Sequence, residues 1–153
     1  MTQKASDLFI ACLEEEGVEY IFGVPGEENL DFLDSLSRSK KIKLILTRHE
    51  QGAGFMAAGY ARASGRVGVC LVTSGPGATN TVTPVRDSMA DSIPMLVICG
   101  QVPTAAIGTD AFQEAPVSAI MGSVAKHVFL VTDPEKLEAT VRTAFEIART
   151  GRP

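Results

Sequence analysis

The sequence predicts an α/β fold in which helices cover both faces of a doubly wound, mainly parallel sheet. Short, almost entirely apolar segments such as "KLILT", "RVGVCLVT" and "IPMLVICG" alternate with helical segments along the chain. Strands that are apolar throughout are typical of parallel sheets that are buried on both faces. A length of 153 residues suits one domain, and we expect residues 1–153 to form it.

Helical periodicity and stop signals define the other elements in order. An amphipathic helix over residues 3–16 ends before Gly17, and the strand "EYIFG" leads into a Pro-Gly turn and an acid-rich helix start. Further helices are expected after "KLILT", at residues 77–91, and at the end of the chain. The last helix has an apolar stripe formed by Leu137, Val141, Ala144, Phe145 and Ala148. The irregular stretch 101–122 is long enough to predict a functional or mobile loop.

Composition excludes several classes of function. The chain has 45% hydrophobic and 21% charged residues and a formal net charge of −4, which disfavours nucleic acid and anionic membranes as partners. No apolar run approaches the ~18 residues of a membrane span, and no signal-peptide pattern is present, so a cytoplasmic location is expected. Cys12, Cys70 and Cys99 are interpreted as buried thiols. The two histidines, His49 and His127, lie far apart in the sequence, and no metal is assigned.

The carboxyl ends of the strands are the expected ligand-binding edge of such a sheet. They carry the segments "GVPG", "TRHEQG", "TSGPGATN" and "CGQVPT". "TSGPGATN" has the strand, glycine turn and helix start that bind anions on backbone N–H groups. However, Asn80 stands where the dinucleotide fingerprint needs glycine, and Pro76 lacks an N–H. A purely structural turn, with Asn80 in the first helical turn, is therefore an equally good interpretation.

Glu50 stands at the start of the glycine- and alanine-rich segment "QGAGFMAAGYARASG". Gly52, Gly54 and Gly59 each cost a helix roughly 0.5–1 kcal/mol relative to alanine, so something must compensate. Small side chains let another backbone or a flat ligand approach closely. This suggests that the helix faces a second subunit or a cofactor, with an ordinary surface carboxylate as the alternative.

Four segments together resemble a known family: "FGVPG", "RHEQGAGFMAAGYARASG", "VTSGPGATNTVTPVRDSMADSIPMLVICGQVPT" and "IGTDAFQEAPV". They are similar to the N-terminal pyrimidine-binding domain of thiamine diphosphate enzymes, and within that group to acetolactate synthase (acetohydroxyacid synthase) large subunits. The resemblance covers nearly the whole chain. It implies that Glu50 hydrogen-bonds N1′ of the cofactor's aminopyrimidine and promotes the imino tautomer, which then removes the proton from thiazolium C2.

The resemblance also implies roles for other positions at the strand ends. Residues near the pyrimidine ring or lining the strand ends beside it would be Pro25, Gly26, Thr73, Gly77 and Asn80. Gln113 would face the substrate side of the thiazolium, and the neighbouring Phe112 would belong either to the substrate channel or to the core. The sequence "VPGEENLDFLDSL" differs from that of many synthases at the corresponding positions and leaves the substrate pair open.

The implied reaction decarboxylates a 2-oxo acid such as pyruvate and joins the product to a second 2-oxo acid. Family members bind the diphosphate and Mg²⁺ through a Gly-Asp-Gly motif that does not occur here, so Mg²⁺, and FAD where it is used, would bind only through other domains. We therefore expect half of an active site, inactive alone, whose partner is the diphosphate-binding domain of the same or another chain in a homodimer or homotetramer. The ending "RTGRP" resembles a linker.

Two alternatives remain at this stage. The first is a natural separate subunit of a two-chain thiamine diphosphate-dependent 2-oxo acid decarboxylase. The second is a non-catalytic interaction module that keeps only the oligomerising fold.

Overall fold

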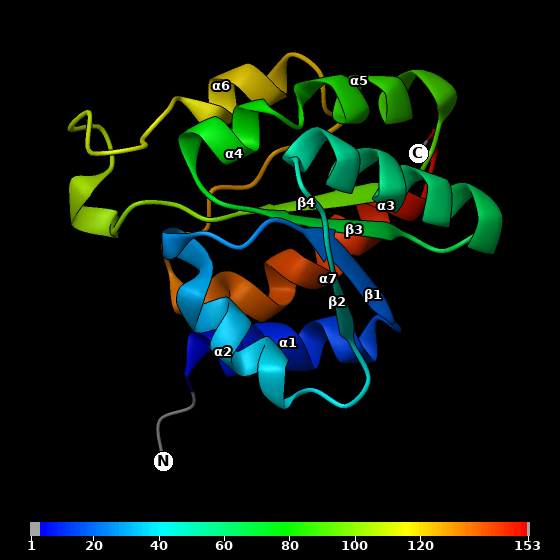
Figure 1. Ribbon diagram of the computed structural model, residues 1–153, viewed down its shortest axis with the longest axis horizontal. Helices are drawn as coiled ribbons and strands as arrows, with labels where there is room; N and C mark the ends of the chain where they lie inside the picture. Colours follow the sequence, from blue (N-terminus) through cyan, green and yellow to red (C-terminus); the bar gives the residue numbers. More distant parts are fainter. Residues whose placement is uncertain (1–3, 153) are drawn as a thin grey trace.

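A computed structural model of the protein describes residues 4–152 and has the predicted α/β architecture. Four parallel strands form one sheet in the order β2-β1-β3-β4, between two layers of helices (Figure 1). The strands are β1 (Tyr20–Gly23), β2 (Lys43–Leu46), β3 (Gly68–Val72) and β4 (Met95–Cys99). The α-helices are α1 (Ala5–Glu15), α2 (Leu30–Arg38), α3 (Glu50–Ser64), α4 (Gly75–Thr79), α5 (Val82–Asp91), α6 (Val117–Gly122) and α7 (Leu137–Arg149). Short 3₁₀ helices are η1 (Glu27–Asn29), η2 (Thr104–Ala106) and η3 (Pro134–Lys136). The predicted fold class is confirmed.

The two faces of the sheet have separate cores. α1, α2 and α7 cover one face, and α3 to α6 cover the other (Figure 1). Val69 and Leu71 of β3 belong to the first core, whereas Cys70 and Val72 belong to the second. All five residues of β3 are buried. A central strand that is covered on both sides needs apolar side chains at every position, which explains its sequence.

The first and last helices match their predicted patterns. α1 ends at Glu15, and Gly17 follows with a φ of +77°, a backbone conformation that glycine adopts readily. Residue 3, part of the predicted helix, lies outside the described residues. In α7 the predicted stripe faces the core, with four members buried and Ala144 half-buried.

The prediction of one helix over residues 77–91 was wrong. The chain forms α4 up to Thr79 and starts again as α5 at Val82. In a continuous helix, the Pro84 ring would clash with the carbonyl of Asn80 and remove a backbone hydrogen bond. With the break, Pro84 lies in the first turn of α5, where no N–H is needed. Asn80 consequently caps the C-terminus of α4 and does not lie in a first helical turn.

The cysteines are buried or half-buried thiols. Burial raises the pKa of Cys70 to about 12 and that of Cys99 to about 11. Because the thiolate is the reactive form, we expect iodoacetamide at pH 8.5 to alkylate Cys99 about 100-fold, and Cys70 about 1000-fold, more slowly in the folded chain than in urea. Mass spectrometry of timed samples measures both rates. Equal rates in the two states would contradict this placement.

Candidate functional site

The carboxyl ends of the four strands meet at one edge of the sheet. The chain passes from β1 outward to β2 and then returns to β3 on the other side of β1. The topological switch point therefore lies between β1 and β3, and ligands of doubly wound sheets bind in the crevice outside it. The segments that begin at Val24 and Thr73 leave the sheet here, and Val24 N donates to Leu71 O at 3.2 Å.

Glu50 is the first residue of α3, at this same edge. His49 caps the helix, since its Nδ1 accepts the N–H of Gln51 at 3.1 Å. The half-buried Glu50 carboxylate accepts a hydrogen bond from Asn80 Nδ2 at 3.0 Å. A carboxylate at a helix N-terminus is stabilised by the helix dipole. Two predicted site residues that lie 30 positions apart are thus in direct contact, because α4 ends at Asn80.

Thr73 lies against two further predicted residues, Gly26 and Gly77. A Cβ built on Gly26 would lie 2.4 Å from Thr73 Cβ, and one built on Gly77 would lie 2.8 Å from Thr73 Cγ2. Gly26 N also donates to Asn29 Oδ1 at 3.0 Å, which fixes the turn after β1. Pro25, in the same turn, is exposed. At the switch point the Thr73 side chain is therefore packed against two chain segments in which glycine leaves room for it.

Glu28 also belongs to this cluster, although the sequence analysis assigned it no role. Its carboxylate accepts a hydrogen bond from the Thr73 hydroxyl. Its Cβ lies 2.9 Å from the position of a Cβ built on Gly100, directly after β4. The signal that could have identified Glu28 is an acidic residue in the first helical turn after a strand that borders the switch point.

The loop before α6 contacts the "SGPG" turn. Ser74 Oγ donates to Gln113 O at 3.1 Å, and a Cβ on Gly75 would lie 2.2 Å from that oxygen. Gln113 has a φ of +60°, and Phe112 beside it is 79% exposed. Phe112 is thus not a core aromatic, which removes one of its two interpretations. Glu114 holds the loop by accepting the N–H groups of Gly108 and Ala111, and these bonds lower its pKa.

The small residues of α3 fall into two groups that differ in their surroundings. Ala53, Ala57 and Ala61 are buried within this chain, and a Cβ on Gly54 would lie 2.4 Å from Pro84 Cγ of α5. Part of the glycine and alanine content is therefore required by packing inside the domain, not by a partner. By contrast, a Cβ on Gly52 or Gly59 would meet nothing within 4 Å.

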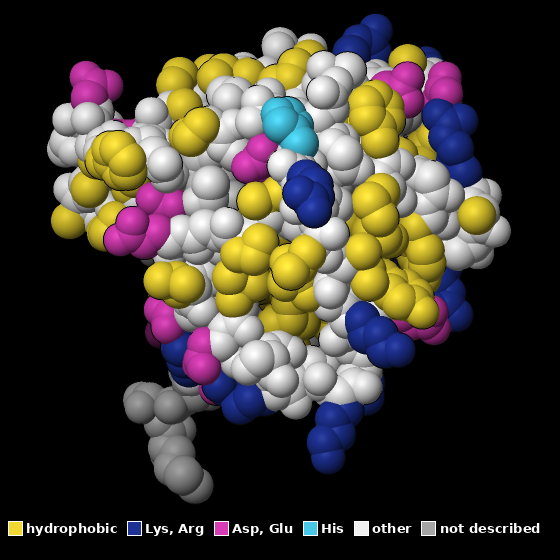
Figure 2. All heavy atoms as spheres, viewed as in Figure 1, with side chains coloured by type: hydrophobic (Ala, Val, Ile, Leu, Met, Phe, Trp, Pro, Cys, Tyr) yellow, Lys and Arg dark blue, Asp and Glu magenta, His cyan; other side chains and the backbone are white. Residues whose placement is uncertain are grey.

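The outer side of α3 carries exposed apolar side chains beside these open glycines. Phe55 and Met56 are 41% and 42% exposed, and Leu46 at the end of β2 is 65% exposed. Hydrophobic side chains form patches on the face of the molecule where α3 and β2 lie (Figure 2). Large apolar surface of this kind is typical of an interface.

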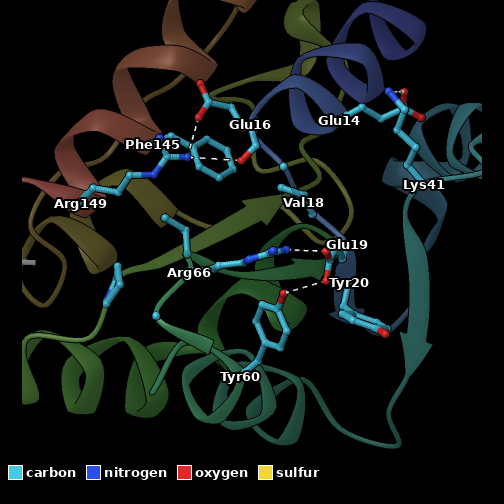
Figure 3. Close-up of a pocket in the computed structure, with 14 residues that line it drawn as sticks. Glu14, Glu16, Val18, Glu19, Tyr20, Lys41, Tyr60, Arg66, Phe145 and Arg149 are labelled. Atoms are coloured by element: carbon cyan, nitrogen blue, oxygen red, sulfur yellow. Dashed lines mark hydrogen bonds and ion pairs between the residues drawn. The ribbon is translucent and has the colours of Figure 1, made fainter. Parts of the chain in front are cut away.

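A cavity of 680 Å³ at the opposite edge of the sheet is a weaker candidate for the site. It lies at the amino ends of the strands and is lined by ionic pairs (Figure 3). Arg66 contacts Glu19 at 2.5 Å and Arg149 contacts Glu16 at 2.5 Å. Since these cations are already paired, they offer little attraction to an anionic ligand.

Among residues 4–152, no three or more His, Cys, Asp or Glu side chains are grouped so that they could hold a metal ion. Within the same range, no helix combines the length and apolar character that crossing a membrane requires.

Comparison with known proteins identifies the class to which this fold and edge belong. Residues 3–121 match the family model described as thiamine pyrophosphate enzyme, N-terminal TPP binding domain. The chain belongs to this family of thiamine diphosphate enzymes.

Relatives of the chain include acetolactate synthases of plants and bacteria. It is 50% identical over 151 residues to acetolactate synthase 2, chloroplastic, of Nicotiana tabacum, and 54% identical over 144 residues to the acetolactate synthase of Mycobacterium bovis. Identity to the acetolactate synthase large subunit of Corynebacterium glutamicum is 51% over 144 residues. These matches cover 94–99% of this chain but only 23% of each relative, so the chain spans less than a quarter of their length.

Proposed function

We propose that this domain is the pyrimidine-binding half of the cofactor site of an acetolactate synthase-like enzyme. The observation that carries the proposal is the Glu50 carboxylate at the N-terminus of α3, held by Asn80 at the carboxyl edge of the sheet. The family and the relatives support thiamine diphosphate as the cofactor. In this proposal Glu50 is the catalytic residue of the domain.

The residues at the carboxyl edge of the sheet fit the pyrimidine ring of this cofactor. An ionised carboxylate can accept about four hydrogen bonds, and the bond from Asn80 uses one of them. Capacity therefore remains for a ring nitrogen of the ligand. Gly26 and Gly77 pack tightly against the Thr73 side chain and so form a compact surface at the ends of β1 and β3. A flat aromatic ring can lie against such a surface.

Each residue has a distinct task in the proposed site. Glu50 accepts a hydrogen bond from N1′ of the pyrimidine, and Asn80 holds the Glu50 carboxylate in place. Pro25, Gly26, Thr73 and Gly77 together form one surface beside the ring, since Gly26 and Gly77 both pack against the Thr73 side chain. Gln113 and the exposed Phe112 lie on the loop that approaches the "SGPG" turn, and we assign them to the substrate side.

The bound cofactor supplies the carbanion chemistry that decarboxylates a 2-oxo acid such as pyruvate and joins it to a second 2-oxo acid. This chain supplies the carboxylate that sets the protonation state of the pyrimidine. Mg²⁺, and FAD where it is used, would be held by other domains of the enzyme. The domain alone is accordingly proposed to be inactive.

The proposed partner is a diphosphate-binding domain that covers the outer side of α3. Leu46, Phe55 and Met56 are exposed there, and Gly52 and Gly59 leave room for a close approach. The partner domain belongs either to the same chain or to a second copy in a dimer or tetramer.

Calorimetry and an activity assay test this proposal together. We expect residues 1–153 alone to bind thiamine diphosphate with Mg²⁺ too weakly for detection, whereas the longer protein that carries the domain binds both and converts pyruvate to acetolactate. Micromolar affinity of the isolated domain for thiamine diphosphate would contradict the proposal that the domain holds only half of the cofactor site. Release of acetaldehyde without acetolactate would instead favour a 2-oxo acid decarboxylase, and a longer protein that binds no cofactor would favour an interaction module.

A further inference from the structure

The loop at residues 100–116, between β4 and α6, has a defined shape although it contains only one short element, η2. It projects from the body of the domain (Figure 1). Gly108, Asp110 and Gln113 have φ angles of +85°, +56° and +60°. Residues other than glycine adopt such angles rarely, and they keep them only where the surrounding structure holds the backbone. Asp110 and Gln113 therefore indicate that another group holds this loop in one shape.

The carboxylate of Glu114 is the group that holds the loop. This half-buried side chain folds back and accepts the N–H groups of Gly108 and Ala111, the second at 3.1 Å. The backbone N–H groups of Gly108, Ala111, Thr109 and Asp110 lower the pKa of the Glu114 carboxyl and so favour its ionised form. Successive N–H groups that converge on one anion form a nest. Residues 108–111 are thus a nest that is filled by a side chain of the same loop.

The nest fixes the backbone on one side of Gln113, and the turn after β3 fixes it on the other. Gln113 O accepts a hydrogen bond from Ser74 Oγ at 3.1 Å. A Cβ built on Gly75 would lie 2.2 Å from the same oxygen, so glycine leaves the room for this contact. Glu114 N also donates to Ala111 O at 2.9 Å and closes the turn between them. The Gln113 side chain consequently starts from a backbone that is held at both ends.

We infer that Glu114 is a positioning residue for the 2-oxo acid, because its nest sets the backbone from which Phe112 and Gln113 reach the substrate side of the site. The inference rests on the proposed function, which assigns those two residues to that side. Glu114 does not act on the substrate itself, since both of its carboxylate oxygens are used inside the loop. Its loss should therefore impair the binding and placement of the 2-oxo acid. Proton removal at C2 of the cofactor, which depends on Glu50, should be unchanged.

Limited proteolysis of residues 1–153 tests the nest without any cofactor. Glutamine has the size of glutamate, but its NH₂ group would face backbone donors, so Glu114→Gln leaves part of the nest without an acceptor. Phe112 is 79% exposed, and we expect chymotrypsin to cleave after it about 10-fold faster in Glu114→Gln than in the unmodified chain. Equal cleavage of the two chains would overturn the inference.

Asp110→Asn is the matched control for both the proteolysis and the kinetics. It removes a charge from the same loop at an exposed position, and asparagine tolerates the φ of +56° there. Its cleavage rate and its kinetics should equal those of the unmodified protein. Effects of Asp110→Asn as large as those of Glu114→Gln would assign them to the charge of the loop and contradict the nest.

Steady-state kinetics of the longer enzyme test the positioning role itself. Glu114→Gln should raise the KM for pyruvate about 10-fold and release more acetaldehyde per acetolactate, because the second 2-oxo acid is placed less accurately. Deuterium exchange at C2 of the bound cofactor should keep its rate, whereas a general structural defect would lower this rate as well. An unchanged KM would overturn the inference, and so would slower exchange at C2.

Gly108→Ala changes the nest from the donor side. A Cβ there would meet nothing within 4 Å, so the substitution strains only the φ of +85°. It should also raise the KM for pyruvate, and the double variant with Glu114→Gln should be no worse than the more impaired single variant, because both changes break the same contact. Additive effects would contradict a shared role. Failure of the proposed function would appear in the unmodified enzyme as absence of cofactor binding, whereas failure of this inference would appear only in the variants.

Discussion

Replacing Glu50 with glutamine in the longer enzyme is expected to slow deuterium exchange at C2 of bound thiamine diphosphate by about 10²- to 10⁴-fold. Glutamine has the size of glutamate, and its carbonyl oxygen can still accept the hydrogen bond from Asn80 Nδ2. The substitution therefore removes the charge and the basic oxygen while it keeps the contact. Proton NMR of acid-quenched samples measures the fraction of C2 that has exchanged at each time.

A matched control is Glu135→Gln, which changes an exposed glutamate in the first turn of another helix, η3, far in sequence from the candidate site. Its exchange rate should equal that of the unmodified enzyme. Calorimetry must show that the Glu50→Gln enzyme still binds the cofactor, since loss of binding would also stop exchange. Full occupancy with an unchanged rate would exclude Glu50 from the proposed role.

The contact between Glu50 and Asn80 also shows where sequence reasoning ends. The position of Glu50 at a helix start was predictable from the apolar strand before it and the small residues after it. Its contact with Asn80 depends on the break between α4 and α5, and the periodicity of residues 77–91 conceals that break. The break is explained by the Pro84 ring, which would clash with the carbonyl of Asn80 in a continuous helix. A helix pattern alone could not have brought the two side chains together.

The sheet itself was easier to predict than its order. The strands could be recognised because β1, β3 and β4 are apolar at consecutive positions and β2 is apolar after Lys43. Their order, β2-β1-β3-β4, depends on which helix packs on which face and therefore on contacts between distant residues. The switch point, and with it the role of Glu28 beside Thr73, becomes visible only once that order is known.

Glycine shows the limit of sequence-based prediction most clearly, because some glycines of this chain are tightly packed and others have no neighbour. Gly68, at the start of β3, faces the backbone of α3: a Cβ there would lie 2.1 Å from Ala57 O. Gly59 lies on the exposed side of α3, and a Cβ there would meet nothing within 4 Å. Gly68 lies in the apolar strand segment "RVGVCLVT" and Gly59 in the helical segment "FMAAGYARASG", but neither segment indicates whether another backbone lies against its glycine.

Gly68→Ala is expected to lower the free energy of unfolding of the domain by about 3 kcal/mol, and the midpoint of thermal unfolding by roughly 10 °C. The obstructing atom belongs to the helix backbone, so α3 must move away from the central strand as a whole. That movement would loosen contacts on both sides of Ala57. Urea unfolding followed by circular dichroism measures the change, and a loss below about 1 kcal/mol would show that α3 packs less tightly on β3 than the structure indicates.

Gly59→Ala is the matched substitution and should have the opposite sign in the isolated domain. It removes a flexible residue from a helix interior without a clash, so the domain should gain about 0.5–1 kcal/mol. In the longer enzyme the gain should disappear and subunit or domain association should weaken, if the proposed partner approaches α3 at this position. Analytical ultracentrifugation compares the association of the two forms. A gain that persists with unchanged association would leave the outer side of α3 without a partner at Gly59 and would require the interface to lie elsewhere.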